Sequence, residues 1–141
     1  MLSSTHSFRY WGRDVTHIHQ TTFGDGSDGT EPGNCMSACL ASVLDVPLDD
    51  VPNFAAKGAR YWDEMQRWLH ARGLFLFELK VPPDQTPGTP DDLHYIASGV
   101  SPRGIRHAVI MREGRLVHDP HPSGTGLTTP PDHFYPIAKL T

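Results

Sequence analysis

The stretch EPGNCMSACLASVLDV, residues 31–46, joins a glycine-rich loop to a short helix and places a cysteine, Cys35, at the junction. Asn34 stands at the N-cap of a helix predicted over 35–45, because asparagine is a preferred residue at that position. Pro47 ends the helix, since a proline disfavours helical backbone at the residue before it. Apolar residues at helical spacing predict its buried face: Met36, Leu40, Val43 and Leu44.

The size and charge of the chain exclude several classes of protein. Its 141 residues fit one domain with a core, and a net charge of −4 gives no basis for binding nucleic acid or a membrane. No apolar run approaches the roughly 20 residues of a membrane span, and residues 1–17 lack the apolar centre of a signal peptide. Two cysteines four residues apart on one helix do not suit a disulfide. We therefore expect a reduced, cytoplasmic protein with a loose arm over 1–14 and a single domain over 15–141.

The rest of the chain has the pattern of one further helix followed mainly by strands. Gly73 is the expected stop signal of a helix over 60–72, and Pro136 weakens a strand over 133–140. The other predicted strands cover residues 15–23, 74–81, 93–100, 105–112 and 115–120. With helices mainly first and strands later, this order indicates an α+β fold.

A cysteine at the first turn of a helix has two interpretations. The helix start offers unpaired N–H groups and the positive end of the dipole, which stabilise a thiolate and can hold an oxyanion that forms beside the sulfur. Alternatively, Cys35 is a small buried apolar residue, as free cysteines often are. Cys39 lies one turn further into the helix, and we expect it in the core.

A nucleophilic thiol needs a base and a group that orients the base, and the stretch HAVIMREGRLVHDP, residues 107–120, offers both. It has the pattern of a hairpin. A three-residue loop over 112–114, with Gly114 in the left-handed conformation, places His107 opposite Asp119. Opposed residues have Cβ atoms roughly 4.5–5.5 Å apart, which lets Asp119 accept a hydrogen bond from His107. A two-residue loop would instead shift the register by one residue and make Asp119 a diagonal neighbour of His107. A separate alternative is that the segment is an ordinary exposed hairpin without a function.

Together, GNCMSACLASVL and the later HAVIM and GRLVHDP segments resemble the papain-like cysteine peptidase superfamily. The resemblance covers residues 18–122 and is nearest to the branch of bacteriocin-leader-processing, or double-glycine, peptidases. That branch carries a Cys-Gly-x-Ala-Cys-Leu-Ala type helix, then a histidine on one strand and an Asp-Pro after the next. Met36 stands where those peptidases usually have glycine.

The resemblance implies a papain-like fold, in which the cysteine helix packs on an antiparallel sheet that carries the histidine and the aspartate. It assigns Cys35 as nucleophile, His107 as base and Asp119 as the third member of a catalytic triad. Gln20, the only glutamine before Cys35, matches the oxyanion-hole glutamine, although it lies 15 residues upstream. The implied activity is hydrolysis or acyl transfer at a peptide or amide bond of a peptide or protein substrate, with no metal or cofactor.

Three further residues are candidates for the substrate cleft. Gly33 and Asn34 directly precede Cys35 and leave access to it. Arg103, shortly before His107, is expected to line the cleft, and it or Arg106 could meet a carboxylate, although most such arginines face solvent.

Two other classes of function stay open. The first is a non-catalytic module that binds a peptide or a protein on a papain-like scaffold. The second is a metal site, because histidines are frequent along the chain. Their spacing is irregular and no cysteine pair accompanies them, which favours surface positions for His17, His19, His118, His121 and His133.

Overall fold

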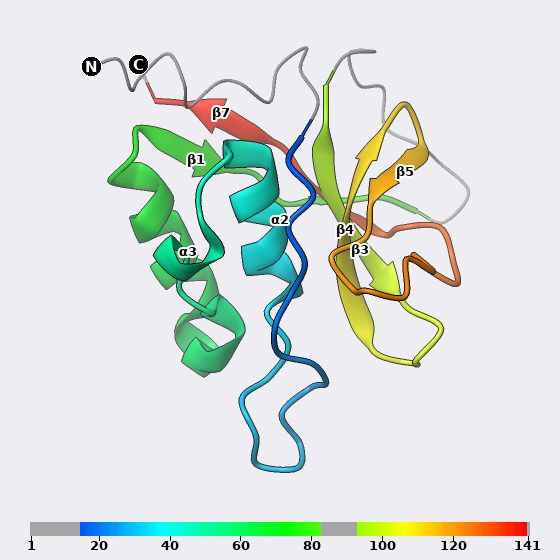
Figure 1. Cartoon of the computed structure of the whole chain (residues 1–141). Helices are drawn as coiled ribbons and strands as arrows, with labels where there is room; N and C mark the ends of the chain where they lie inside the picture. Colours follow the sequence, from blue (N-terminus) through cyan, green and yellow to red (C-terminus); the bar gives the residue numbers. More distant parts are fainter. Residues whose placement is uncertain (1–14, 83–92, 141) are drawn as a thin grey trace.

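The computed structural model describes residues 15–82 and 93–140, and the arm predicted over 1–14 lies outside them. The described chain is a mixed helix and antiparallel-sheet fold, as the α+β prediction requires (Figure 1). Its helices are α2 (Cys35–Leu44), α3 (Tyr61–His70) and the 3-10 segments η1 (Leu48–Asp50) and η2 (Phe54–Arg60). Its strands are β1 (Leu74–Leu76), β2 (Leu79–Lys80), β3 (Tyr95–Val100), β4 (Arg106–Arg112), β5 (Arg115–His118), β6 (His133–Tyr135) and β7 (Ile137–Lys139).

Five of these strands form the main sheet, in the order β2-β6-β3-β4-β5, and every neighbouring pair is antiparallel. The central pair, β3 and β4, runs in register from Tyr95 opposite Met111 to Val100 opposite Arg106. His107 lies on β4 opposite Gly99 of β3, whereas β5 pairs with β4 further along, at Ile110–Arg112.

The strands predicted over 74–81 and 133–140 are each broken in the middle. Their first and last parts pair as β1 with β7 and as β2 with β6, so the two segments run alongside one another but contribute to two different sheets. The break falls at Pro136, which has no N–H to give a ladder and whose carbonyl accepts from the N–H of Phe77 at 2.9 Å.

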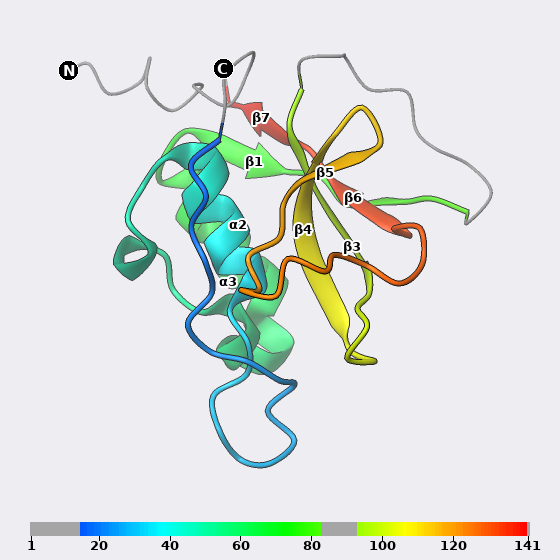
Figure 2. The same ribbon diagram turned by 45° about the vertical axis from the view of Figure 1, so that its right-hand side comes forward.

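Helix α2 packs against β4, and both α-helices lie on the same side of the main sheet (Figures 1 and 2). Nine of its ten residues are buried, because the small side chains Ala38, Ala41 and Ser42 let its backbone approach the strands closely. The main core lies between the two layers and includes Leu40, Met65, Leu69, Ile96, Ile110 and Ile137. A smaller cluster of Val81, Tyr95, Ala97 and Phe134 forms a second core group.

The segment over 15–23 is extended but is not the strand that its alternating pattern predicts. Its backbone bonds go to two different elements. The N–H groups of Thr16 and Ile18 reach the carbonyl and hydroxyl of Ser42 on α2, at 3.2 and 3.1 Å, whereas Gln20 N–H reaches the carbonyl of Pro120 at 2.9 Å. The segment thus connects the cysteine helix to the chain after β5.

Within the described residues, no helix has both the length and the apolar character needed to cross a bilayer.

Helix α3 ends near the predicted position. Gly73 follows it with a φ of 75°, a left-handed conformation that glycine adopts without strain, and its N–H bonds the carbonyl of His70 at 3.0 Å.

Candidate active site

Cys35 begins α2 and is the one residue of that helix that is not buried. Asn34 occupies the N-cap position, as predicted, but its side chain makes no capping hydrogen bond. Its Oδ1 instead accepts from the backbone N–H groups of Thr21 and Thr22, at 2.9 and 3.1 Å. The asparagine therefore fixes the extended segment beside Cys35 and leaves the helix start without a side-chain cap.

His107 and Asp119 form a buried ion pair on the adjacent sheet. His107 Nε2 lies 2.6 Å from Asp119 Oδ1, and their side chains are only 3% and 1% exposed. The carboxylate is held in place by two backbone donors: the N–H of His121 reaches Oδ1 at 2.9 Å and the N–H of Gly126 reaches Oδ2 at 2.7 Å. Two backbone hydrogen bonds thus fix the carboxylate that orients the imidazole.

The predicted contact between these residues is present, but the predicted hairpin register is wrong. Arg112 pairs with Arg115, so the loop has only two residues, Glu113 and Gly114, with φ values of 52° and 75°. Positive φ at both positions is the type I′ geometry that matches strand twist. A β-bulge then follows, so Ile110 faces His118. Asp119 is the first residue after β5, and its side chain reaches His107 while the backbone N–H groups of His121 and Gly126 hold it there.

The electrostatics of the pair follow from its partners. Burial lowers the pKa of His107, but hydrogen bonds to Asp119 and Cys35, together with the charges of both, outweigh this and raise it to about 9. Burial raises the pKa of Asp119, whereas the bonds from His107 and from the two backbone donors lower it to about 2. At neutral pH the imidazole is therefore protonated and the carboxylate is ionised. Because Nε2 faces Asp119, Nδ1 is the ring nitrogen left for Cys35.

Gln20 lies close to Cys35 despite the distance in sequence. Its side chain is buried, its Nε2 donates to the carbonyl of Thr22 at 2.9 Å, and Nε2 lies where a Cβ on Gly33 would be 3.4 Å away. The intervening loop is closed at its base, because the N–H of Gly33 bonds the carbonyl of Gly24 at 2.9 Å. Thr22 thus uses one of the two amide hydrogens of Gln20. The amide oxygen of Gln20, Oε1, is buried and has no hydrogen-bond partner among the described residues.

Two hollows meet at Cys35 and His107, and both are also lined by Gly33 and Arg106. The helix-side hollow, of about 390 Å³, lies between α2, α3 and the sheet; its walls include Met36, Ala55, Tyr61, Ser98, Ala108 and Tyr135. The loop-side hollow, of about 290 Å³, is lined by Gln20, Phe23, Arg103, Ile105 and His121. The sulfur therefore faces a cleft that extends to both sides of it.

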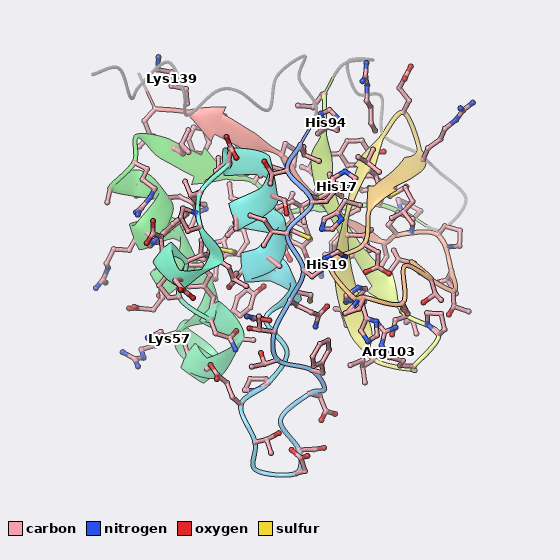
Figure 3. The ribbon with its side chains drawn as sticks, in the orientation of Figure 1. His17, His19, Lys57, His94, Arg103 and Lys139 are labelled. Atoms are coloured by element: carbon pink, nitrogen blue, oxygen red, sulfur yellow. The ribbon has the colours of Figure 1, made fainter. Side chains whose placement is uncertain are left out.

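The three candidate cleft residues all lie at these hollows. Gly33 lines both, Asn34 lines the helix-side hollow and Arg103 lines the loop-side hollow. Arg103 is exposed and lies near the turn between β3 and β4 (Figure 3). Arg106 does meet a carboxylate, but that carboxylate belongs to the chain: its two terminal nitrogens lie 2.7 and 2.9 Å from the oxygens of Asp132.

Sequence reasoning missed the hydroxyl groups of the helix-side hollow. Ser98 is on β3, Tyr135 on β6 and Tyr61 on α3, so they come together only through the tertiary fold. It also missed the backbone of Gly126, which holds Asp119 from a loop with no motif of its own. The only local signal is Tyr61 at the start of a predicted helix, and a tyrosine there is usually a packing residue.

Within the described residues, the histidines outside the pair do not assemble a metal site. His17 and His19 lie on the extended segment (Figure 3), with ring centroids 4.7 and 5.2 Å from that of His118. His118 uses Nε2 to bond the carbonyl of Ile18 at 2.7 Å, so the rings pack rather than converge on an ion. Across residues 15–82 and 93–140, no three histidine, cysteine or acidic side chains are grouped as metal ligands.

The two cysteines have opposite environments. Cys39 is fully buried in the main core, and burial raises its pKa well above the usual value, with the nearby Cys35 and Asp119 acting in the same direction. This agrees with the prediction that Cys39 is a packing residue. Cys35 is half-buried and borders both hollows.

Comparison with protein-family models, with curated proteins and with solved structures finds no match to this chain.

Proposed function

We propose that the chain is a papain-like thiol enzyme that cleaves or transfers the acyl group of a peptide or amide bond. The observation that carries the proposal is that Cys35 and His107 border both hollows together, with His107 bonded to the buried Asp119. A thiol beside an imidazolium, which a fixed carboxylate orients, is the arrangement that nucleophilic catalysis by cysteine requires.

Each residue has a defined role in the proposed reaction. The sulfur of Cys35, as a thiolate paired with the His107 imidazolium, attacks the carbonyl carbon and the carbonyl electrons move to oxygen. The Nδ1 proton of His107 passes to the leaving nitrogen as the C–N bond breaks, which leaves a thioester on Cys35. A water or an amine then attacks the thioester carbon and His107 takes its proton; the C–S bond breaks, which releases the acyl product and restores the Cys35 thiolate. Asp119 keeps the imidazole in one orientation throughout.

The oxyanion is the second requirement. The N–H of Cys35, at a helix start without a side-chain cap, is one donor for it. The second hydrogen of Gln20 Nε2 is the other, since only one is used by Thr22 and Gln20 borders the loop-side hollow with Cys35. This role for Gln20 is part of the proposal.

The proposal is tested by the pH dependence of Cys35 alkylation with iodoacetamide, read by mass mapping. The natural chain is expected to label fast at Cys35 at neutral pH. His107→Gln is expected to slow this by about tenfold or more, because the thiolate loses its cation. His70→Gln, at the exposed end of α3, is the matched control and is expected to label like the natural chain. Equal rates in the two variants would show that His107 does not activate the thiol.

A further inference from the structure

A row of hydrogen bonds crosses the wall of the helix-side hollow. Arg106 Nη1 donates to Ser98 Oγ at 3.2 Å, and Ser98 Oγ lies 3.0 Å from the hydroxyl of Tyr135. Ser98 and Tyr135 are only 3% and 8% exposed, so the bond between their hydroxyls is buried. All three residues border the same hollow as Cys35.

The direction of these bonds is fixed at one end. A guanidinium can only donate, so Ser98 Oγ accepts from Arg106. Either hydroxyl of the Ser98–Tyr135 pair could donate. The arrangement that leaves no buried Ser98 hydrogen unpaired among the described residues has the serine donating to the tyrosine. The oxygen of Tyr135 is then an acceptor, and its own hydrogen is left to point into the hollow.

Tyr61 adds a second donor to the same hollow. Burial raises the pKa of its hydroxyl, and the nearby Cys35 and Tyr135 raise it further, so the group keeps its hydrogen across the working pH range. No hydrogen-bond partner holds this hydroxyl among residues 15–82 and 93–140, and it borders the hollow together with Tyr135. A ligand in the hollow thus meets two O–H donors close to the sulfur.

The charges around the hollow oppose an anionic ligand. Arg106 is the one arginine or lysine in its lining, and Asp132 already neutralises it through two bonds. Glu78 lies close enough to both tyrosines to raise the pKa of each. The other cation of the lining, the His107 imidazolium, is likewise paired with Asp119. A carboxylate placed there would therefore meet no unpaired cation, whereas a neutral carbonyl oxygen satisfies the donors without an unpaired charge.

We propose that the helix-side hollow is a specificity site that binds a neutral amide carbonyl of the substrate through the hydroxyls of Tyr135 and Tyr61. The substrate class is then a peptide that presents a backbone carbonyl or an asparagine or glutamine carboxamide beside the attacked bond, in preference to an acidic or alkyl group. This inference rests on the proposed function, since it places the substrate against Cys35.

Three thiol reagents with one reactive group test it: N-alkyl chloroacetamides of equal length whose chains end in a carboxamide, a carboxylate or an isopropyl group. The rate of Cys35 alkylation is measured for each and divided by the rate with iodoacetamide. The carboxamide reagent is expected to be about threefold to tenfold faster than the isopropyl reagent, the range of one net hydrogen bond, and the carboxylate reagent is expected to be the slowest.

The variants assign that preference to the hydroxyls. Tyr135→Phe and Tyr61→Phe each remove one oxygen and are each expected to bring the carboxamide-to-isopropyl ratio to about twofold or less. Tyr95→Phe is the matched control, because its buried hydroxyl accepts from Gly114 N–H at 3.2 Å, away from the hollow, and it is expected to keep the natural ratio.

Two results would overturn the inference: a carboxylate reagent that is the fastest of the three, or a carboxamide preference that is absent or survives both substitutions. Neither result would contradict the proposed function. That function is tested separately, by the effect of His107→Gln on labelling with iodoacetamide. A normal carboxamide preference with no effect of His107→Gln would instead identify a binding site on a chain that is not an enzyme.

Discussion

Replacing Asp119 by asparagine is the substitution that most directly tests the buried pair. The carboxylate accepts from His107 and His121 through Oδ1 and from Gly126 through Oδ2. An asparagine keeps the shape but has one oxygen and one NH₂ group. If its oxygen faces His107, its NH₂ opposes the Gly126 N–H; if its oxygen faces Gly126, its NH₂ opposes both other donors. Either orientation leaves a buried donor without an acceptor.

The magnitude follows from these contacts. An orphaned buried donor costs about 1–3 kcal/mol, and the hydrogen bond to a charged partner contributes about 1.5–3 kcal/mol. We expect Asp119→Asn to lower the free energy of unfolding by about 2–4 kcal/mol and to leave a folded protein. Because Asp119 is the largest single contributor that raises the pKa of His107, we also expect that pKa to fall from about 9 toward its usual value near 6.5.

The assay combines denaturant unfolding with the pH profile of iodoacetamide labelling at Cys35. Asp119→Asn should slow the labelling of Cys35 at neutral pH. It should also lower the pH at which His107 loses its proton, which NMR of the imidazole measures. Asp28→Asn is the matched control, because it makes the same exchange at an exposed carboxylate that accepts from Thr30 N–H at 3.1 Å. We expect it to change the free energy of unfolding by less than about 0.5 kcal/mol and to leave the labelling rate of Cys35 unchanged. A labelling profile of Asp119→Asn that matches the natural one would refute the orienting role of the carboxylate.

Three further predictions follow from burial, space and charge. Cys39→Ser should lower the free energy of unfolding by about 1–3 kcal/mol in a denaturant titration, because it buries a hydroxyl among apolar side chains, while labelling at the other cysteine persists. Gly33→Ala should slow thiol labelling several-fold, since a Cβ there lies 3.2 and 3.3 Å from the carbonyls of Gly24 and Thr22 and displaces that wall; an unchanged rate would contradict this. The stability that His107 contributes, on the order of 3 kcal/mol, is fully present below pH 6.5 and is lost as the pH rises through about 9, because its pKa is raised in the folded state. A His107→Gln variant should lack that alkaline loss in unfolding titrations.

The parts of the site that were predicted from the sequence are those with a local signal. Cys35 stands at a glycine-asparagine junction before a run of helical spacing, and His107 and Asp119 lie on one hairpin, so short-range chemistry was enough to select them. The prediction of their contact was right for a partly wrong reason. A two-residue turn and a bulge, rather than a three-residue loop, bring Asp119 to the histidine.

The parts that were not predicted depend on partners far away in the chain. The alternation over 15–23 resembles a strand, but the backbone of that segment bonds Ser42 on one side and Pro120 on the other. Asn34 has the sequence of an N-cap, yet the returning segment offers its amide better partners. Nothing near Tyr61 or Tyr135 in sequence indicates that their hydroxyls border one hollow.

Turnover of an activated ester tests the central claim most directly, because it separates a catalyst from a binding module with a reactive thiol. With p-nitrophenyl acetate, Cys35 is expected to displace p-nitrophenolate and to carry one acetyl group as a thioester, which mass mapping locates. Acylation removes the thiolate charge that helps to hold the His107 proton, and the imidazolium releases this proton to solvent. Water, deprotonated by the neutral His107, then releases acetate, so nitrophenolate should appear in a burst followed by a steady phase. His107→Gln should suppress the steady phase, and Cys35→Ala should remove both. An acetyl group that stays on Cys35 without release, or a release rate that does not depend on His107, would contradict the account.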